Sequence, residues 1–161
     1  MNKKSGLSML MLIITIVVLI ILMSAITLKI SIASGRENLS VLVNNVSVIE
    51  EYIASCNVLK EELPFSETLT AAQVKALIDE DNVVDFQNEL TNNGDSSTTS
   101  FKKIDMKRAG IKKTFTGYEK QGENDIYVYS ESTGTVYYLL GVEYDGRVYF
   151  SVNNNVTNIV K

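Results

Sequence analysis

Histidine and tryptophan are absent from this chain of 161 residues, and cysteine and proline occur once each. Without histidine, and with Cys56 as its one thiol, the chain lacks metal sites built from His and Cys clusters and catalytic pairs of the Ser–His and Cys–His kinds. A single cysteine cannot close a disulfide within the chain. Carboxylates such as Glu50 and Glu51 are sequence neighbours, so they do not converge on one helix face. We therefore expect no catalytic residue, no cofactor and no metal, and we do not expect an enzyme.

Charge is also missing from one long stretch near the N-terminus. No Asp, Glu, Lys or Arg occurs from Leu7 to Leu28, and Lys3 and Lys4 precede this apolar run. A helix of that length spans about 30 Å, the thickness of a bilayer core. With the lysines first, the positive-inside rule predicts a single-pass protein of the cell membrane, its N-terminus cytoplasmic and the rest exported.

Two simpler interpretations of this run stay open. One is a cleaved secretory signal, with Ser31-Ile32-Ala33 as a small-residue cleavage site, although the run is longer than the ~7–15 apolar residues of such signals. The other is a plain N-terminal signal anchor, which the length also allows.

The order Lys3-Lys4-Ser5-Gly6, followed at once by Leu7 and a long apolar run, resembles the class III leader of type IV pilins and pseudopilins. The resemblance implies a leader of residues 1–6. It also implies cleavage by a prepilin peptidase between Gly6 and Leu7, and N-methylation of Leu7. Such subunits are assembled into a filament by an ATPase and a platform protein.

Met11 is the departure from that family pattern, because the fifth mature position usually carries Glu. In the family, that Glu is thought to neutralise the terminal ammonium of a neighbouring subunit, and an unpaired charge in an apolar core is costly. A subunit that offers no carboxylate is tolerated best at the tip. Met11 therefore favours a minor or tip subunit over the major one.

Beyond the apolar run, the pattern becomes that of an amphipathic helix. Apolar residues recur at spacings of three and four, which is one stripe of a helix. Without a proline before Pro64, one helix could extend to about Glu62, with Gly35 as a point of bending. A coiled-coil stalk is the open alternative. The stripe consists of Leu39, Leu42, Val46, Ile49, Ile53 and Cys56.

Residues 63–161 are expected to form a head that ends in a three-stranded antiparallel meander. Strands are predicted at 125–130, 135–140 and 147–152, where aromatic and β-branched residues concentrate. Asp145-Gly146 is a strong hairpin signal, and Gly141 suggests a bulge in the middle strand. The face expected to lie on the amphipathic helix is Ile126, Val128, Val136, Tyr138, Leu140, Val148 and Phe150.

The rest of the head gives weaker signals. Short helices are predicted at 71–80, where Thr70 can serve as N-cap, and at 83–90. Residues 91–100 read as a polar loop without apolar anchors. One or two helical turns are expected at 101–109, and a loose polar tail at 153–161.

A basic segment lies between Lys102 and Lys113, in a chain whose formal net charge is −4. Such a run is most often a solvated face, whose lysines pair with acidic residues. A patch for DNA or another anionic polymer is the alternative, so nucleic acid stays an unlikely but possible partner. The segment and its extension consist of Lys102, Lys103, Lys107, Arg108, Lys112, Lys113 and Lys120.

These patterns predict an α+β protein of the pilin kind. A long N-terminal helix, transmembrane over 7–29 and amphipathic over 30–62, would pack on a small antiparallel head. The expected function is that of a structural subunit, and a minor one, of a type IV pilus or type II secretion-like filament. Its partners would be other pilin-like subunits, the assembly machinery and the membrane. The alternative is a membrane-anchored protein whose exported head binds a partner or polymer without polymerising.

Overall fold

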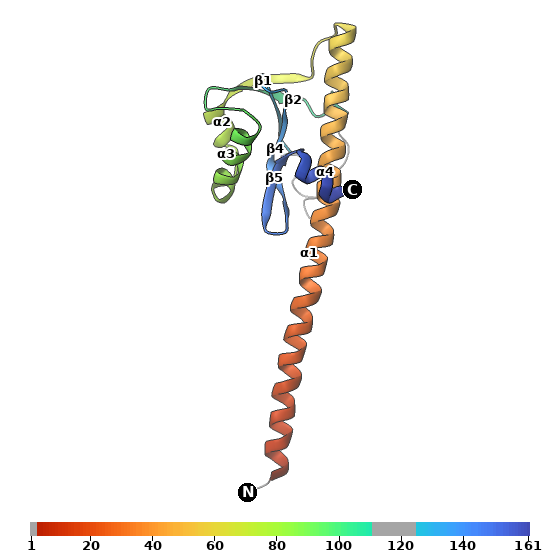
Figure 1. The fold of residues 1–161 in the computed structure, drawn as a ribbon, viewed down its shortest axis with the longest axis vertical. Helices are drawn as coiled ribbons and strands as arrows, with labels where there is room; N and C mark the ends of the chain where they lie inside the picture. Colours follow the sequence, from red (N-terminus) through yellow and green to blue (C-terminus); the bar gives the residue numbers. More distant parts are fainter. Residues whose placement is uncertain (1–2, 111–124) are drawn as a thin grey trace. The chain divides into compact units, whose positions relative to one another are not determined.

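The computed structural model describes residues 3–110 and 125–161, and within helix α1 it places the side chains of residues 11–23 and 33–59 (Figure 1). The chain divides into two compact units, Met1–Ser34 and Gly35–Lys161. The elements are α1 (Lys3–Leu59), β1 (Phe65–Thr70), α2 (Ala71–Lys75), the 3-10 helix η1 (Glu80–Asn82), α3 (Val83–Asn92), β2 (Ser100–Ile104), β3 (Tyr127–Ser130), β4 (Val136–Tyr144), β5 (Arg147–Ser151) and α4 (Asn154–Val160).

The C-terminal part of α1 lies on the sheet through the apolar stripe. Every member of the stripe, from Leu39 to Cys56, is at most 6% exposed. The helix ends at Leu59 because Lys60 adopts a left-handed backbone conformation, with φ of 56°. The Glu61 N–H then donates to the Cys56 carbonyl at 3.0 Å. This cap ends the helix before Pro64 is reached.

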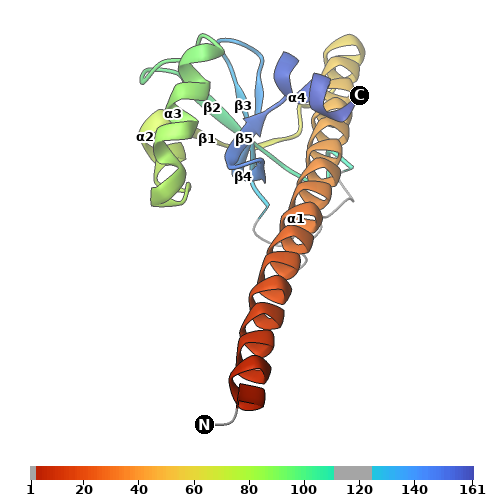
Figure 2. The same cartoon turned by 60° about the horizontal axis from the view of Figure 1, so that its bottom comes forward.

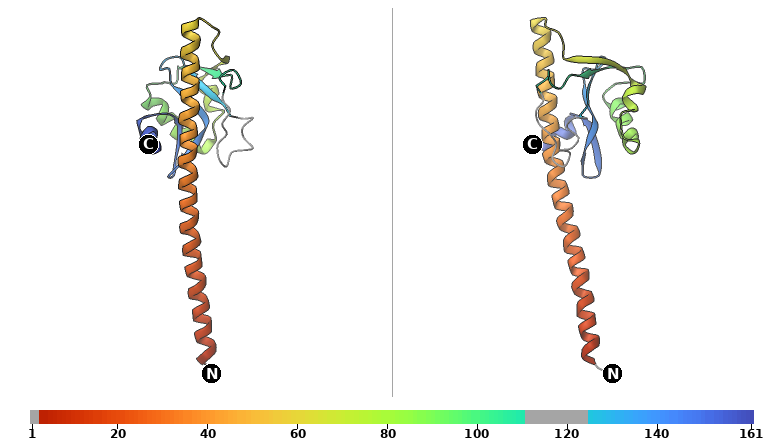
Figure 3. Two further views of the ribbon diagram at one scale, coloured as in Figure 1. Left: turned by 90° about the vertical axis from the view of Figure 1, so that its right-hand side faces the viewer. Right: turned by 180° about the vertical axis from the view of Figure 1, so that it is seen from behind.

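Five antiparallel strands form one sheet in the order β1-β2-β3-β4-β5, which is the order of the chain. The C-terminal part of α1 and α4 cover one face, and α2 and α3 cover the other (Figures 2 and 3). One cluster of buried side chains fills each space, so the sheet is the middle of three layers.

The expected three-stranded sheet is therefore wrong, since β1 and β2 add two strands at one edge. One or two helical turns were expected at 101–109, yet residues 100–104 form β2, in which Phe101 is fully buried and pairs with Leu69 of β1 and Ser130 of β3. Pairing on both sides satisfies the backbone of this short segment and overrides its local preference. The tail expected at 153–161 is instead α4, which Asn153 caps and Val156 anchors.

The face predicted to lie against the amphipathic helix is only partly right. Val136, Tyr138 and Leu140 belong to the cluster that includes α1. Val128 and Phe150 belong to the other cluster, with α2 and α3, and Ile126 and Val148 pack against it. Because both faces of the sheet are covered, β3 and β4 bury successive residues. Their alternation therefore does not identify the face.

Two further predictions are wrong: that the first half of the long helix crosses a membrane, and that the protein is a single-pass protein of the cell membrane. In the part of the chain that the structure describes, no helix is long and apolar enough to cross a membrane. A span needs about 20 apolar residues.

Of the predictions made at glycines, the turn at Gly146 and the bulge at Gly141 are confirmed, whereas the bend at Gly35 is not. Asp145 and Gly146 have φ of 51° and 71° and form the predicted two-residue turn, with Tyr144 opposite Arg147. At Gly141 the predicted bulge is present as a shift of register in β4. Gly35, by contrast, lies within the unbroken helix α1. A Cβ there would lie 2.8 Å from the Glu143 carbonyl oxygen, so this glycine permits close approach of the β4–β5 hairpin.

Candidate assembly site

A run of exposed apolar side chains, interrupted only by Thr15, is the most unusual surface among the described residues. From Met11 to Met23, twelve large apolar residues are each 47% to 66% exposed. The one polar residue among them, Thr15, donates its hydroxyl to the Met11 carbonyl at 2.8 Å, as a helical threonine often does. We call residues 11–23 the apolar segment.

The apolar segment is apolar on every side of the helix. A surface helix of a globular protein shows one apolar stripe, as the C-terminal part of α1 does, whereas a helix that is apolar all round is normally buried. Exposed apolar surface of this extent marks a site of interaction. The segment is therefore the first candidate for a functional surface.

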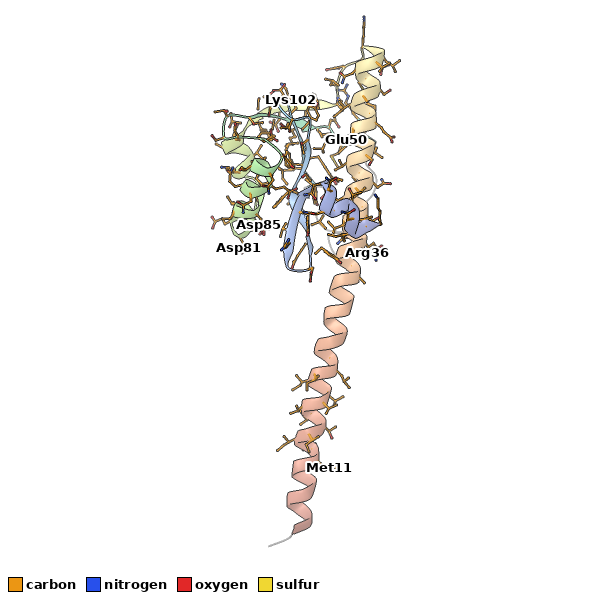
Figure 4. The ribbon with its side chains drawn as sticks, in the orientation of Figure 1. Met11, Arg36, Glu50, Asp81, Asp85 and Lys102 are labelled. Atoms are coloured by element: carbon orange, nitrogen blue, oxygen red, sulfur yellow. The ribbon has the colours of Figure 1, made fainter. Side chains whose placement is uncertain are left out.

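The residues singled out for processing lie at the start of the same helix. Gly6 and Leu7 belong to the backbone of α1, and their side chains lie outside those that the structure places. Met11 is the first described side chain and is 63% exposed (Figure 4). Cleavage and methylation at Gly6 and Leu7 stay predictions.

The basic segment has acidic partners within the chain. Lys103 contacts Glu67 at 2.8 Å. Lys102, which is labelled in Figure 4, lies 3.4 Å from Glu131. The guanidinium of Arg108 likewise lies 3.5 Å from the Glu62 carboxylate. These pairs favour the solvated-face interpretation over a patch for nucleic acid. Lys112, Lys113 and Lys120 lie outside the described residues.

A buried carboxylate that the sequence did not suggest, Asp95, organises the polar loop. It is 5% exposed and accepts hydrogen bonds from the hydroxyls of Ser130 and Ser132 at 2.6 Å, Tyr137 at 2.7 Å and Thr133 at 3.0 Å. Burial acts to raise the pKa of Asp95, but these hydroxyls more than offset it and hold the pKa below its ordinary value. The loop predicted to have no apolar anchors is thus held by a polar one, the Asp95 carboxylate.

A second buried carboxylate, Glu89 of α3, holds the edge strand β5. It accepts the backbone N–H groups of Phe150 at 3.1 Å and Ser151 at 2.7 Å, and also the Ser151 hydroxyl. Burial raises the pKa of Glu89 above its ordinary value, and these hydrogen bonds only partly oppose that. An edge strand presents unpaired N–H groups. Glu89 therefore satisfies two successive backbone donors near the end of β5.

A polar groove of about 300 Å³ lies between α3 and the β4–β5 hairpin, with Asp85 and Glu143 among its lining residues. Asp85 and its neighbour Asp81 are labelled in Figure 4. The described residues contain no cluster of three or more His, Cys, Asp or Glu side chains that could hold a metal.

No protein-family model, curated protein or solved structure matches this chain.

Proposed function

We propose that this protein is a structural subunit that assembles with copies of itself, or with similar chains, through the apolar segment of α1. It would be a subunit of a pilin-like filament. The observation that carries the proposal is the continuous exposure of twelve large apolar side chains from Met11 to Met23. Assembly buries that surface between parallel helices and leaves the Gly35–Lys161 unit to form the outside.

The energetics support association. Fully burying a Val, Leu, Ile or Met side chain contributes roughly 1.5–3 kcal/mol. Each of the twelve is about half exposed, so complete burial of what remains contributes roughly 10–20 kcal/mol per copy. Association costs about 4–15 kcal/mol in lost freedom. The apolar segment is thus sufficient for assembly when most of it is covered.

The leader-like junction at Gly6 and Leu7 supports a filament as the kind of assembly. A type IV pilin-like subunit is matured at such a junction and then packs its apolar helix among those of its neighbours. Met11 fits a minor subunit, since it offers no carboxylate to a neighbour's ammonium. The Gly35–Lys161 unit supports a structural role, because its buried carboxylates are occupied by hydrogen bonds of the fold itself.

A charge placed in the apolar segment tests the proposal. Val17 is 48% exposed in the middle of the segment, and Val17→Lys should abolish assembly because a lysine would have to be buried unpaired. The matched control is Val84→Lys, since Val84 is 68% exposed on the other unit and should tolerate the same change. The assay is sedimentation and negative-stain electron microscopy of the full chain and of a chain that begins at Leu7.

The expected result is polymers from the wild type and Val84→Lys, and dispersed protein from Val17→Lys. Wild-type protein that stays monomeric at all concentrations in detergent-free buffer would contradict the proposal. Polymers of Val17→Lys that match those of the wild type would show that another surface drives assembly.

A further inference from the structure

The polar groove between α3 and the β4–β5 hairpin continues along β5. A second hollow, of about 310 Å³, shares Asp85, Gly146 and Val148 with the first. All the residues that line the two hollows belong to the Gly35–Lys161 unit. Figure 1 shows α3 beside the hairpin that forms the opposite wall. Each hollow alone reaches the lower end of the range of about 300–1,000 Å³ that is typical of sites for small ligands.

One face of α3 supplies the polar wall of this groove. Asp85, Asn88 and Asn92 follow one another at spacings of three and four residues, so they lie on the same face of the helix. All three line the second hollow and are exposed, and Asp85 is labelled in Figure 4. Their side chains end in planar groups, and each amide presents a donor and an acceptor side by side. This wall can therefore make paired hydrogen bonds to a ligand.

The opposite wall, formed by the hairpin, combines apolar surface with one cation. A Cβ at Gly146 would meet no atom within 4 Å, so the backbone of the turn borders open space. Val148 is partly buried and packs against the cluster that includes α2 and α3. Arg147 is exposed between these two residues. The hairpin thus sets a small apolar surface and one positive charge across from the polar face of α3.

These groups suit a neutral polyhydroxy ligand better than an ion. The carboxylates of Asp85 and Glu143 repel an anion, and Arg147 opposes a cation. In the part of the chain that the structure describes, no cluster of carboxylates could hold a metal. A sugar hydroxyl both donates and accepts, so one amide or carboxylate can bind two neighbouring hydroxyls at once. The C–H face of a sugar ring is apolar and can lie against Gly146 and Val148.

We propose that the groove binds a neutral hexose unit of an oligosaccharide, with Asp85, Asn88 and Asn92 hydrogen-bonded to its hydroxyls. The inference goes beyond assembly and does not depend on it. Glu89 also lines the groove, but its carboxylate is occupied by the N–H groups of Phe150 and Ser151, so it fixes β5 against α3 and is not a sugar ligand. An extended peptide is the competing occupant. It is disfavoured because the wall formed by α3 is polar and offers no apolar pocket for peptide side chains.

Saturation-transfer difference NMR tests the proposal with the methyl glycosides of glucose, galactose, mannose and N-acetylglucosamine. The full chain is dispersed in dodecylphosphocholine, a detergent whose head group carries no sugar. At least one of the four glycosides should bind, and Asn88→Ala should weaken its binding by about 3- to 10-fold, the loss of one net hydrogen bond. The matched control is Asn57→Ala, which should bind like the wild type because Asn57 is exposed on α1 and does not line the groove. Both asparagines are exposed, so neither exchange should unfold the protein.

The outcomes separate the occupants of the groove. Binding of a glycoside that Asn88→Ala weakens and Asn57→Ala leaves unchanged would support the proposal. Failure of all four glycosides to bind would overturn it. Equal binding by the wild type and Asn88→Ala would place the sugar elsewhere and overturn it as well. A hexapeptide of alternating threonine and valine, measured in the same way, is the competing probe, and its binding in the absence of any sugar binding would assign the groove to an extended peptide. None of these results bears on assembly through the apolar segment.

Discussion

Removing the Asp95 carboxylate should destabilise the Gly35–Lys161 unit more than any other exchange of an acid in it. Four hydroxyls donate to this carboxylate within 3.0 Å, from Ser130, Ser132, Thr133 and Tyr137. Asp95→Ala leaves them without their shared acceptor. The loop at 91–100 and the β3–β4 turn then lose the contact that joins them.

The magnitude follows from the hydrogen bonds. A bond to a charged group contributes about 1.5–3 kcal/mol net, but bonds to one shared acceptor are not additive. Some donors can turn to one another, since the hydroxyls of Ser130 and Ser132 lie 3.1 Å apart and those of Thr133 and Thr135 lie 2.9 Å apart. We therefore expect Asp95→Ala to cost about 3 kcal/mol of unfolding free energy, a large share of the ~5–15 kcal/mol typical of a domain.

The effect depends on pH with a defined sign. The pKa of Asp95 is held below its ordinary value of 3.8, so the ionised carboxylate is favoured in the folded state. Its contribution is fully present above that ordinary value and is lost as the pH falls through the lower folded-state pKa. The difference between wild type and Asp95→Ala should be full at neutral pH and should shrink in that acidic window.

Chemical denaturation of chains trimmed to residues 30–161, followed by circular dichroism, measures this difference. The control is Asp81→Ala: Asp81 is exposed on η1, and its removal should change stability by less than about 0.5 kcal/mol. If Asp95→Ala is as stable as Asp81→Ala at neutral pH, the hydroxyl network does not stabilise the fold and the reasoning is refuted.

Three further exchanges test other parts of the account. Gly35→Ala should destabilise the protein in thermal unfolding, because the added Cβ would lie 2.8 Å from the Glu143 carbonyl oxygen. This clash should outweigh the preference of about 1 kcal/mol that Ala normally has over Gly in a helix interior. A gain in stability would contradict the close approach of the hairpin to the helix. Gly146→Val should lower the melting temperature because φ of 71° strains a β-branched residue, and an unchanged melting temperature would count against the turn. Gly6→Val should block cleavage of the leader before Leu7. N-terminal mass spectrometry of the native protein checks where the mature chain begins. A wild-type chain that begins at Met1 or Ser34 would contradict the proposal of a pilin-like subunit.

Periodicity predicted the elements whose burial is one-sided or whose turns have strong signals. The stripe from Leu39 to Cys56 is buried throughout, as its spacing indicated. The three C-terminal strands are present as β3, β4 and β5, close to the expected ranges. Thr70 caps α2 through a capping box with Gln73, although that helix ends at Lys75 rather than near residue 80. Local sequence determines these features.

Long-range pairing decided what the sequence did not reveal. β1 has a mixed polar pattern, and β2 is short with two adjacent lysines, so neither shows the alternation of a half-buried strand. They form because each pairs with the other and β2 also pairs with β3. The sites of Asp95 and Glu89 could not be predicted either, because their partners lie far along the chain.

Oxidation of methionines is the most direct test of the claim that the apolar segment is buried between copies. Met11 and Met23 mark its two ends and are 63% and 66% exposed, whereas Met106, partly buried against the core of the other unit, serves as internal reference. The rate of sulfoxide formation at each residue is measured by mass spectrometry in assembled protein and in protein diluted below its assembly concentration. The account predicts that assembly protects Met11 and Met23 several-fold relative to Met106. Equal oxidation of both in the two states would contradict it.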